Sequence, residues 1–311
     1  MTKTYSLLRD GETFVSPHFQ VKEFKTQGDT VIIANKLINK LEKLSDCLNN
    51  APIRIRKAHS AFSVEISVVG YLPTQLAVLA EICAFESIQI AGNYLIVDVV
   101  DTRERQNYIK TCKWIHIFKF DKRRIKSMAF PEIRDTVKNY AKRFNDEETH
   151  IFNGGFFGTY KFPVYVYKTH GEYVSKTKDH HYGIGVTADG DIKYGDVERD
   201  NYIEFLSGHP VLTDNHTQCD ISYANELRGA NPRTVLGCDD DNVYVVLVDG
   251  RSNHAKGLTL FALRELMTRL DIANAINVDG GGSTIGAKGG KVLNSPTENR
   301  VISNAIVIKY F

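Results

Sequence analysis

Apolar residues in the first part of the chain recur first at helical spacing and then at strand spacing. Leu37, Leu41, Leu44 and Leu48 lie on one face, with lysine and glutamate opposite, so the pattern predicts an amphipathic helix within 30–50. Alternating apolar and charged residues predict strands at 52–56 and 64–68. A second helix is expected after Pro73, because proline suits the first helical turn, and a strand at 94–100 closes this part. We place a domain boundary near residue 110.

Beyond that boundary the pattern predicts a strand at 114–120 and then a helix through Ile133, Val137, Tyr140, Ala141 and Phe144. A short strand at 149–152 ends in Asn153-Gly-Gly, where the glycines indicate tight backbone geometry. From 184 to 212 short strands alternate with Asp-Gly, Tyr-Gly and Gly-His-Pro turns.

The most informative stretch is a strand–helix–strand pattern near the end of the chain. The apolar run 243–248 predicts a strand buried on both faces, Thr259 suits the N-cap of a helix, and 273–278 predicts another strand. Such a crossover unit makes the two strands parallel. Asp249 and Asp279, which follow the strands, should then meet at one carboxyl edge, about 5 Å apart for neighbouring strands or about 10 Å with one strand between them.

Composition and charge narrow the class of protein. The chain has 311 residues, of which 42% are hydrophobic and 24% charged, which excludes a disordered protein and makes two domains the first expectation. Lys and Arg number 39 against 37 Asp and Glu, a formal charge of +2 that does not favour nucleic acid as a partner.

Targeting signals and cysteines add little to this picture. No apolar run has the length of a membrane span, and the N-terminus lacks a signal-peptide pattern. We therefore expect the protein to be cytoplasmic on synthesis. The five scattered cysteines favour inert thiols over a disulfide framework.

The residues at the predicted edge favour an anionic, oxygen-rich ligand. Arg233, Arg251 and Arg300 offer bidentate forks, and the glycine loops offer free backbone N–H groups. Two alternatives stay open: Arg251 pairs with Asp249 in a structural ion pair, or Asp-Gly and Gly-Gly-Gly are plain turns. His209, beside Pro210, is either an acid or base or, more commonly for such a turn, a surface residue.

Five blocks, taken together, carry a family resemblance. They are Asn153-Gly-Gly-Phe-Phe157, Asn231-Pro-Arg-Thr-Val-Leu-Gly237, Val248-Asp-Gly-Arg-Ser252, Asn277-Val-Asp-Gly-Gly-Gly-Ser-Thr284 and Arg300-Val-Ile-Ser-Asn-Ala305. In this order, over residues 112–311, they resemble the phosphodiester glycosidase family, the family of N-acetylglucosamine-1-phosphodiester α-N-acetylglucosaminidase. The resemblance implies hydrolysis of a sugar C1–O–phosphate bond in a phosphorylated glycan or glycosyl phosphate.

The resemblance also implies a set of site residues. Asp279 and Asp249 would take the carboxylate roles, with nucleophile and base left open between them. The phosphate and sugar would be bound by Asn153, Gly155, Arg233, Thr234, Arg251, Gly281, Gly282, Ser283 and Arg300. The resemblance implies no certain cofactor, and a divalent cation such as Ca2+ between the carboxylates stays open.

Residues 1–110 resemble, in a damaged form, the zinc peptidases of the D-Ala-D-Ala carboxypeptidase and endolysin type. The resemblance rests on 15–24, 52–55 and 94–98. Glu65 stands near the place of a ligand Asp, and Ile96 takes the place of a ligand His. Because isoleucine cannot bind zinc, we expect a module without metal, in which His59 is an ordinary surface residue rather than a relic ligand.

These inferences give a two-domain α+β protein. A degenerate peptidase-like α+β module occupies 1–110, and a phosphodiester glycosidase α/β domain with a mixed sheet occupies 111–311. By analogy, the pairing suggests a phage or bacterial cell-wall setting, with the protein virion-associated or released to the wall. The alternative is a non-catalytic phosphoglycan-binding protein of a virion or wall assembly, and an active zinc peptidase ranks last. The sequence makes no prediction of oligomeric state.

Overall fold

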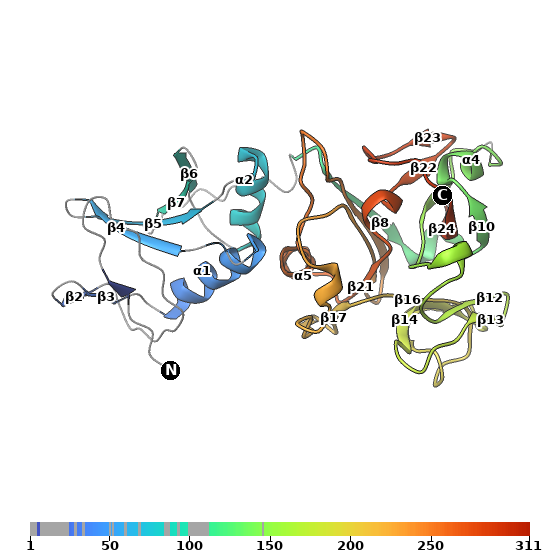
Figure 1. Cartoon of the computed structure of the whole chain (residues 1–311). Helices are drawn as coiled ribbons and strands as arrows, with labels where there is room; N and C mark the ends of the chain where they lie inside the picture. The colour runs from blue at the N-terminus through green and yellow to red at the C-terminus, as the bar shows by residue number, and fades with distance from the viewer. Residues whose placement is uncertain are drawn as a thin grey trace. The chain divides into compact units, whose positions relative to one another are not determined.

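The computed structural model describes residues 112–311 apart from Asn145. Before residue 112 it describes the segments 5–6, 25–27, 30–32, 35–49, 51, 53–58, 61–67, 70–83, 88–91 and 94–98. The chain divides into two compact units, Met1–Cys112 and Lys113–Phe311, and each is described by itself. Figure 1 shows the elements of both.

The first unit contains two small antiparallel sheets and two helices. The strand orders are β1-β3-β2 and β4-β5-β7-β6. The predicted helices and strands of this part are confirmed, and the second helix begins at Pro73. The bounds are β1 Tyr5–Ser6, β2 Lys25–Gln27, β3 Thr30–Ile32, α1 Asn35–Cys47, β4 Ile53–Ala58, β5 Ala61–Ser67, α2 Pro73–Ile82, β6 Ile88–Ala91 and β7 Tyr94–Asp98.

The second unit is rich in strands, which form three sheets (Figure 1). One six-stranded sheet has the order β18-β17-β21-β19-β20-β8. Another has the order β10-β24-β11-β22-β23, with β9 also on β24, and a five-stranded sheet has the order β13-β12-β16-β14-β15. The strand bounds are β8 Ile115–Asp121, β9 Ile125–Ala129, β10 Glu132–Asp135, β11 Thr149–Asn153, β12 Tyr167–Thr169, β13 Glu172–Ser175, β14 Tyr182–Thr187, β15 Ile192–Asp196, β16 Tyr202–Ser207, β17 Val211–Asp214, β18 Thr217–Gln218, β19 Arg233–Cys238, β20 Asn242–Val248, β21 Asn274–Val278, β22 Gly286–Lys288, β23 Lys291–Val292 and β24 Ile302–Tyr310.

The helices of the second unit are few and short. They are η1 Lys122–Arg124, α4 Val137–Ala141, η2 Thr159–Lys161, η3 Asn225–Leu227, α5 Leu260–Arg269 and η4 Gly281–Ser283.

The expectation of a mixed sheet is wrong, because every strand pair in the described part of this unit is antiparallel. The crossover unit itself is as predicted: β20 and β21 both pair antiparallel with β19, so they run in the same direction. The strand β19 lies between them. The unit is therefore α+β with antiparallel sheets.

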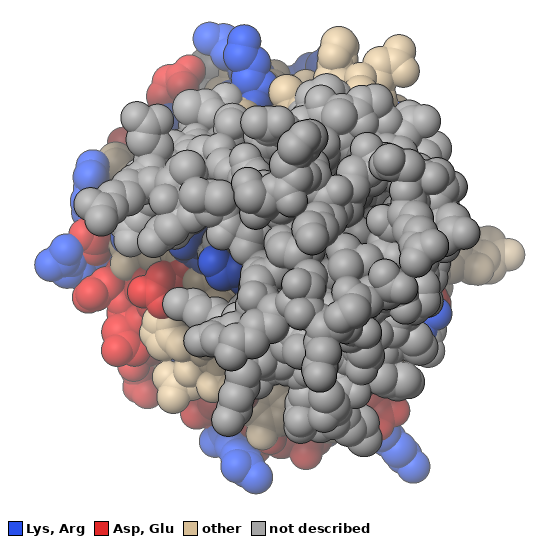
Figure 2. Space-filling view, turned by 90° about the vertical axis from the view of Figure 1, so that its left-hand side faces the viewer, with Lys and Arg blue, Asp and Glu red and all other residues tan. Residues whose placement is uncertain are grey.

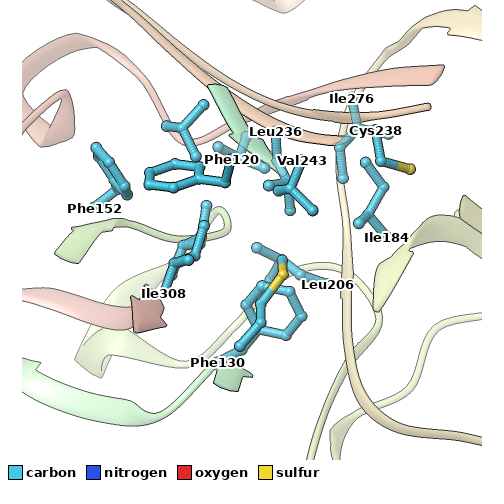
Figure 3. Packing of buried hydrophobic residues seen from close by; sticks show 14 of the residues in the cluster. Phe120, Phe130, Phe152, Ile184, Leu206, Leu236, Cys238, Val243, Ile276 and Ile308 are labelled. Atoms are coloured by element: carbon cyan, nitrogen blue, oxygen red, sulfur yellow. The ribbon is translucent and has the colours of Figure 1, made fainter. Parts of the chain in front are cut away.

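One hydrophobic core joins all three sheets of the second unit. Figure 3 shows Phe152, Phe120 and Ile308 on one side of this cluster and Ile184, Leu206 and Ile276 on the other. In β20, Val243, Val245 and Leu247 point into the cluster, and Val246 and Val248 are buried as well. The continuous apolar run thus corresponds to a strand covered on both faces, as predicted.

The helix α5 packs against β17 and β18. The side chain of Thr259 accepts a hydrogen bond from the backbone N–H of Ala262, which confirms the predicted N-cap. Leu263, Leu266 and Met267 are buried on its inner face.

The helix predicted through Ile133 and Phe144 is much shorter than expected. Ile133 belongs to strand β10, which pairs with β24, and α4 covers only Val137–Ala141. The Thr136 hydroxyl accepts a hydrogen bond from Asn139 N–H and starts the helix there. Pairing with β24 therefore overrides the helical spacing before Thr136.

Among the residues that Figure 2 colours, acidic and basic side chains are both seen, in keeping with the nearly balanced charge. Within the described segments, no helix has the length and apolar character needed to cross a membrane.

Candidate active site

Three strand ends meet at one edge of the six-stranded sheet that contains β19, β20 and β21. Arg233 at the start of β19 pairs with Val248, and Thr234 pairs with Val278. Asp249 and Asp279 follow the ends of β20 and β21, so their backbones begin about 10 Å apart, with one strand between them. The prediction that both carboxylates follow strands of one edge is confirmed, and each side chain has its own set of partners.

Asp279 is 9% exposed and lies among hydrogen-bond donors. One carboxylate oxygen accepts from Gly280 N–H at 3.0 Å, and the other accepts from Arg300 Nη2 at 3.2 Å. Burial raises the pKa of Asp279, while hydrogen bonds from Ser283 and Arg300 oppose that rise. Arg300 also donates to the Ser283 hydroxyl at 2.8 Å. A buried carboxylate with a raised pKa beside an arginine is a candidate for chemistry.

Asn153 joins the two six-stranded sheets beneath Asp279. It is completely buried at the end of β11. Its Oδ1 accepts from the Thr234 hydroxyl at 2.8 Å and from Ile285 N–H at 3.2 Å, and its Nδ2 donates to the Asp279 carbonyl at 2.6 Å. Asn153, bonded to Thr234, therefore holds the backbone of Asp279 in place, and the contact of both residues with a ligand stays a prediction.

Gly155 is fixed by a residue that the list of predicted site residues lacks. The Asn304 side chain on β24 accepts a hydrogen bond from Gly155 N–H at 2.8 Å. The Asn304 oxygens fill the space where a side chain at Gly154 would stand, which explains a glycine there.

Asp249 is 4% exposed, and both of its carboxylate oxygens are in use. His116 Nε2 on β8 lies 2.8 Å from Oδ2, while Asn294 Nδ2 donates to Oδ1 at 2.8 Å. Ser295 N–H donates to Oδ1 at 3.1 Å. Asp249 thus fastens the loop that follows β23 to the end of β20.

Arg233 is 4% exposed and is held by backbone carbonyls. Its Nε donates to Leu258 O at 3.0 Å, and its Nη2 donates to Leu227 O at 2.7 Å and Gly229 O at 2.9 Å. Among the described residues, no carboxylate pairs with it. Burial, and secondarily the charge of Arg251, lower the pKa of Arg233 to about 10. Two guanidinium groups therefore raise the positive potential here.

Arg251 lies beside the glycine loop and makes no ion pair with Asp249. Its Nε and Nη2 donate to Asn231 Oδ1 at 3.1 and 2.9 Å, and its Nη1 lies 4.0 Å from a Glu298 carboxylate oxygen. A Cβ at Gly281, whose φ is +59°, would meet the Arg251 guanidinium, and a Cβ at Gly282 would overlap the Glu298 carboxylate. The glycines thus let a cation and an anion approach the loop closely.

His209 is buried, so its interpretation as a surface residue is wrong. It is 6% exposed, and its Nε2 lies 2.8 Å from a Glu226 carboxylate oxygen. Rings of Tyr165, His180 and Tyr223 surround it, with centroids 4.8 to 5.5 Å from its own. Nearby lies a cavity of about 440 Å³, lined by Lys178, Asp179, His180, His181, Tyr182, Asp196, Glu198, Gly208, Val211 and Tyr223.

Apart from Asp249, which is bound to His116 and to the loop at Ser295, the predicted site residues fall into two adjoining groups, and a few important residues were missed. Around the Asp279 backbone and side chain lie Asn153, Gly155, Thr234, Ser283 and Arg300; around the glycine loop lie Arg233, Arg251, Gly281 and Gly282. Four residues that the structure brings to the site were not predicted: His116, Asn294, Glu298 and Asn304. Asn304 falls inside the last block of the resemblance, whereas His116 and Asn294 carry no local signal.

Among the described residues, no group of three or more His, Cys, Asp or Glu side chains is arranged to hold a metal ion. His59 and the side chains of Glu65 and Ile96 lie outside the described residues. The possible Ca2+ remains a prediction.

Comparison with known proteins places the second unit in a class. A family model described as phosphodiester glycosidase matches residues 147–309. The catalytic domain of zebrafish N-acetylglucosamine-1-phosphodiester α-N-acetylglucosaminidase, auto-inhibited by its pro-peptide, has a similar fold, with a TM-score of 0.51 and 19% identity over 63% of this chain and 83% of that one. A hypothetical protein from Synechocystis gives a TM-score of 0.51 at 14% identity, over 83% of this chain and 76% of that one.

Two sequence relatives match over shorter stretches. An uncharacterized protein derived from the SPbeta prophage of Bacillus subtilis is 32% identical over 88 residues, which are 27% of this chain and 14% of the relative. The Mus musculus N-acetylglucosamine-1-phosphodiester α-N-acetylglucosaminidase is 24% identical over 95 residues, which are 30% of this chain and 18% of the relative. The chain thus matches less than a fifth of the length of either relative.

The family model covers more than half of the chain, and the chain belongs to the phosphodiester glycosidase family. The zinc-peptidase resemblance of residues 1–110 finds no support in these comparisons. A few apolar strands and a helix recur in many folds, so without the ligand-bearing runs they did not specify that family.

Proposed function

We propose that the protein hydrolyses a glycosyl phosphodiester at the bond between the sugar C1 and the phosphate oxygen. Water oxygen joins C1, the bonding electron pair leaves with the phosphate oxygen, and a water proton passes to a carboxylate. The products are a free sugar and a phosphomonoester. Family membership supports the reaction type, and the prophage-derived relative supports a phage setting. A bacterial wall as the place of action is part of the proposal.

The observation that carries the proposal is the Arg233 guanidinium, buried with no carboxylate beside it among the described residues. A buried charge without a counter-ion is costly, and an anionic ligand lowers that cost. Arg251 adds a second charge next to it, as the lowered pKa of Arg233 indicates. A phosphate bound by Arg233 and Arg251 would lie beside the glycine loop, between Arg251 and Asp279. The two guanidinium groups would stabilise the negative charge that develops on the phosphate oxygen as its bond to C1 breaks.

Asp279 is the carboxylate that we assign to the reacting carbon. As a carboxylate it stabilises an oxocarbenium-like transition state, either as nucleophile or as base for water. Arg300 and Ser283 orient it.

Asp249 and Glu298 compete for the role of second carboxylate. Asp249 is predicted from its strand position, but its oxygens are bound to His116 and to the loop at Ser295. Glu298 is 48% exposed and rests against Gly282. We infer that Glu298 is better placed to exchange a proton with water, because its carboxylate has solvent access and Asp249 serves to position the loop.

The test is hydrolysis in water enriched in oxygen-18. UDP-N-acetylglucosamine and a sugar-1-phosphodiester with an alkyl alcohol are incubated with the purified protein, and the products are analysed by mass spectrometry. The proposal expects the label on the released sugar. Label on the phosphate would mean cleavage of the P–O bond and a phosphodiesterase instead. Tight binding with no sugar release, with or without added Ca2+, would favour the binding-protein alternative.

A further inference from the structure

Cations lie against aromatic rings in the segment 157–162, which is connected to Asp279 through Arg300. The Arg300 guanidinium, which is bound to Asp279, lies 5.2 Å from the centre of the Phe157 ring. The Lys161 ammonium lies 4.4 Å from the same ring, and the Arg134 guanidinium lies 5.7 Å from the Phe162 ring. We call Arg134, Phe157, Tyr160, Lys161 and Phe162 the ring–cation strip.

The outer rings of the strip are exposed to an unusual degree. Tyr160 is 84% exposed and Phe162 is 59% exposed. Tyrosine and phenylalanine on the surface add little to folding stability, since their apolar area stays in water. Neighbouring exposed apolar side chains are typical of an interaction surface.

The loop that carries these rings is held in a defined shape. Gly158 N–H donates to Phe162 O, and Val164 N–H donates to Phe156 O, both at 2.9 Å. Within this frame, Tyr160 and Lys161 have φ angles of +57° and +64°. Two consecutive left-handed residues other than glycine are each unfavourable, because the Cβ atom comes too close to the following carbonyl oxygen. The frame therefore fixes a backbone arrangement that local preference opposes, in which the Tyr160 and Phe162 side chains are exposed while Phe157 packs against the core.

We propose that the ring–cation strip binds further repeats of a glycan whose sugars are linked by phosphodiesters, so that the substrate is a polymer. This inference rests on the proposed function, because it takes the cleaved linkage to lie at Asp279. Sugar rings present apolar C–H faces to the aromatic rings, and the phosphates between them meet Lys161 and Arg134. The acidic side chain of Glu132 lies 3.8 Å from Arg134, and both side chains are exposed. The ammonium of Lys161 is the second cation that the phosphates of the ligand would meet.

Charge complementarity favours this occupant over a lipid. A lipid tail needs a continuous apolar surface, whereas here a cation lies against each of the Phe157 and Phe162 rings. Rings paired with cations suit a ligand in which sugars are joined by phosphates.

Direct binding tests the inference without any turnover. The probes are a synthetic oligomer of N-acetylglucosamine 1-phosphate repeats, an uncharged N-acetylglucosamine oligomer of equal length, and a sugar phosphate with a lipid tail, each labelled for fluorescence anisotropy. We expect Tyr160→Ala and Phe162→Ala each to weaken binding of the phosphate oligomer about 3- to 10-fold, as loss of one aromatic contact does. Lys161→Ala should weaken it and reduce its dependence on salt.

Phe311→Ala is the matched control. Phe311 is 62% exposed, and the Lys126 ammonium lies 4.0 Å from its ring. Phe311 follows the far end of β24, about 30 Å along the strand from Ile302, which is two residues after Arg300. This variant should bind every probe as the wild type does.

Other outcomes would overturn the inference. Equal binding of the uncharged oligomer, equal losses in Phe311→Ala, or losses confined to the lipid probe would each refute a polymeric phosphate ligand. Hydrolysis of UDP-N-acetylglucosamine should proceed at the wild-type kcat in the strip variants. If the oligomer binds as expected and no sugar is released from any substrate, the proposed function fails while the binding surface stands.

Discussion

The replacement Asp279→Asn removes one negative charge from a site that is 9% exposed, and it preserves the shape of the side chain. A carboxylate and a developing positive charge about 4 Å apart interact by about 4 kcal/mol at an effective dielectric constant of about 20. Because each 1.36 kcal/mol of barrier changes the rate tenfold, we expect kcat to fall about 10³-fold. Release of reducing sugar from a glycosyl phosphodiester measures this loss.

The stability of the same variant should change much less. Asparagine leaves Arg300 without its carboxylate partner, but it also removes the unfavourable burial of a charge. We expect the Tm to shift by only a few degrees, with substrate affinity largely kept. Asp240→Asn, in the turn at the opposite end of the β19–β20 hairpin, is the control and should change neither activity nor Tm.

The pH dependence of stability gives a second measure of Asp279. Its folded-state pKa lies above the unfolded value, so the ionised carboxylate destabilises the fold above the folded pKa. That destabilisation disappears as the pH falls to the unfolded value. The wild type should therefore gain stability relative to Asp279→Asn as the pH is lowered through this range.

Turnover of Asp279→Asn within tenfold of the wild type, or a Tm loss that accounts for the lost activity, would refute the role assigned to Asp279.

Three further predictions follow from the site. Arg233→Lys should raise KM and lower the Tm, because lysine cannot bond all three carbonyls that Arg233 binds. Arg251→Lys should raise KM with little change in Tm. Equal Tm losses in the two variants would contradict this difference in burial. Glu298→Gln should lower kcat at unchanged Tm. Asp249→Asn should lower the Tm by several degrees, because it weakens the hydrogen bonds that hold the loop at Ser295. The reverse pattern would restore Asp249 as the second carboxylate. Metal analysis of the purified protein should find no stoichiometric zinc, and one zinc per chain would revive the peptidase interpretation.

The local parts of this protein could be predicted from its sequence. The continuous apolar run of β20, the capping threonine before α5 and the apolar strand of β21 are written in neighbouring residues. Period and capping act over a few positions, so they are readable without a fold. The strand ends then placed Asp249 and Asp279 at one edge.

Only the tertiary structure decided how those ends are used. The strand β19 came between β20 and β21, β24 drew Ile133 out of a helix, and His209 was buried by rings from other strands. His116 lies 133 positions from Asp249 in the sequence, yet its hydrogen bond occupies one oxygen of the Asp249 carboxylate. The Glu298 carboxylate lies close to Gly282 because glycine has no side chain there, and nothing in the sequence near Gly282 predicts this contact. Burial and hydrogen bonding between distant segments set the chemistry of each side chain, and no local pattern records which segments will meet.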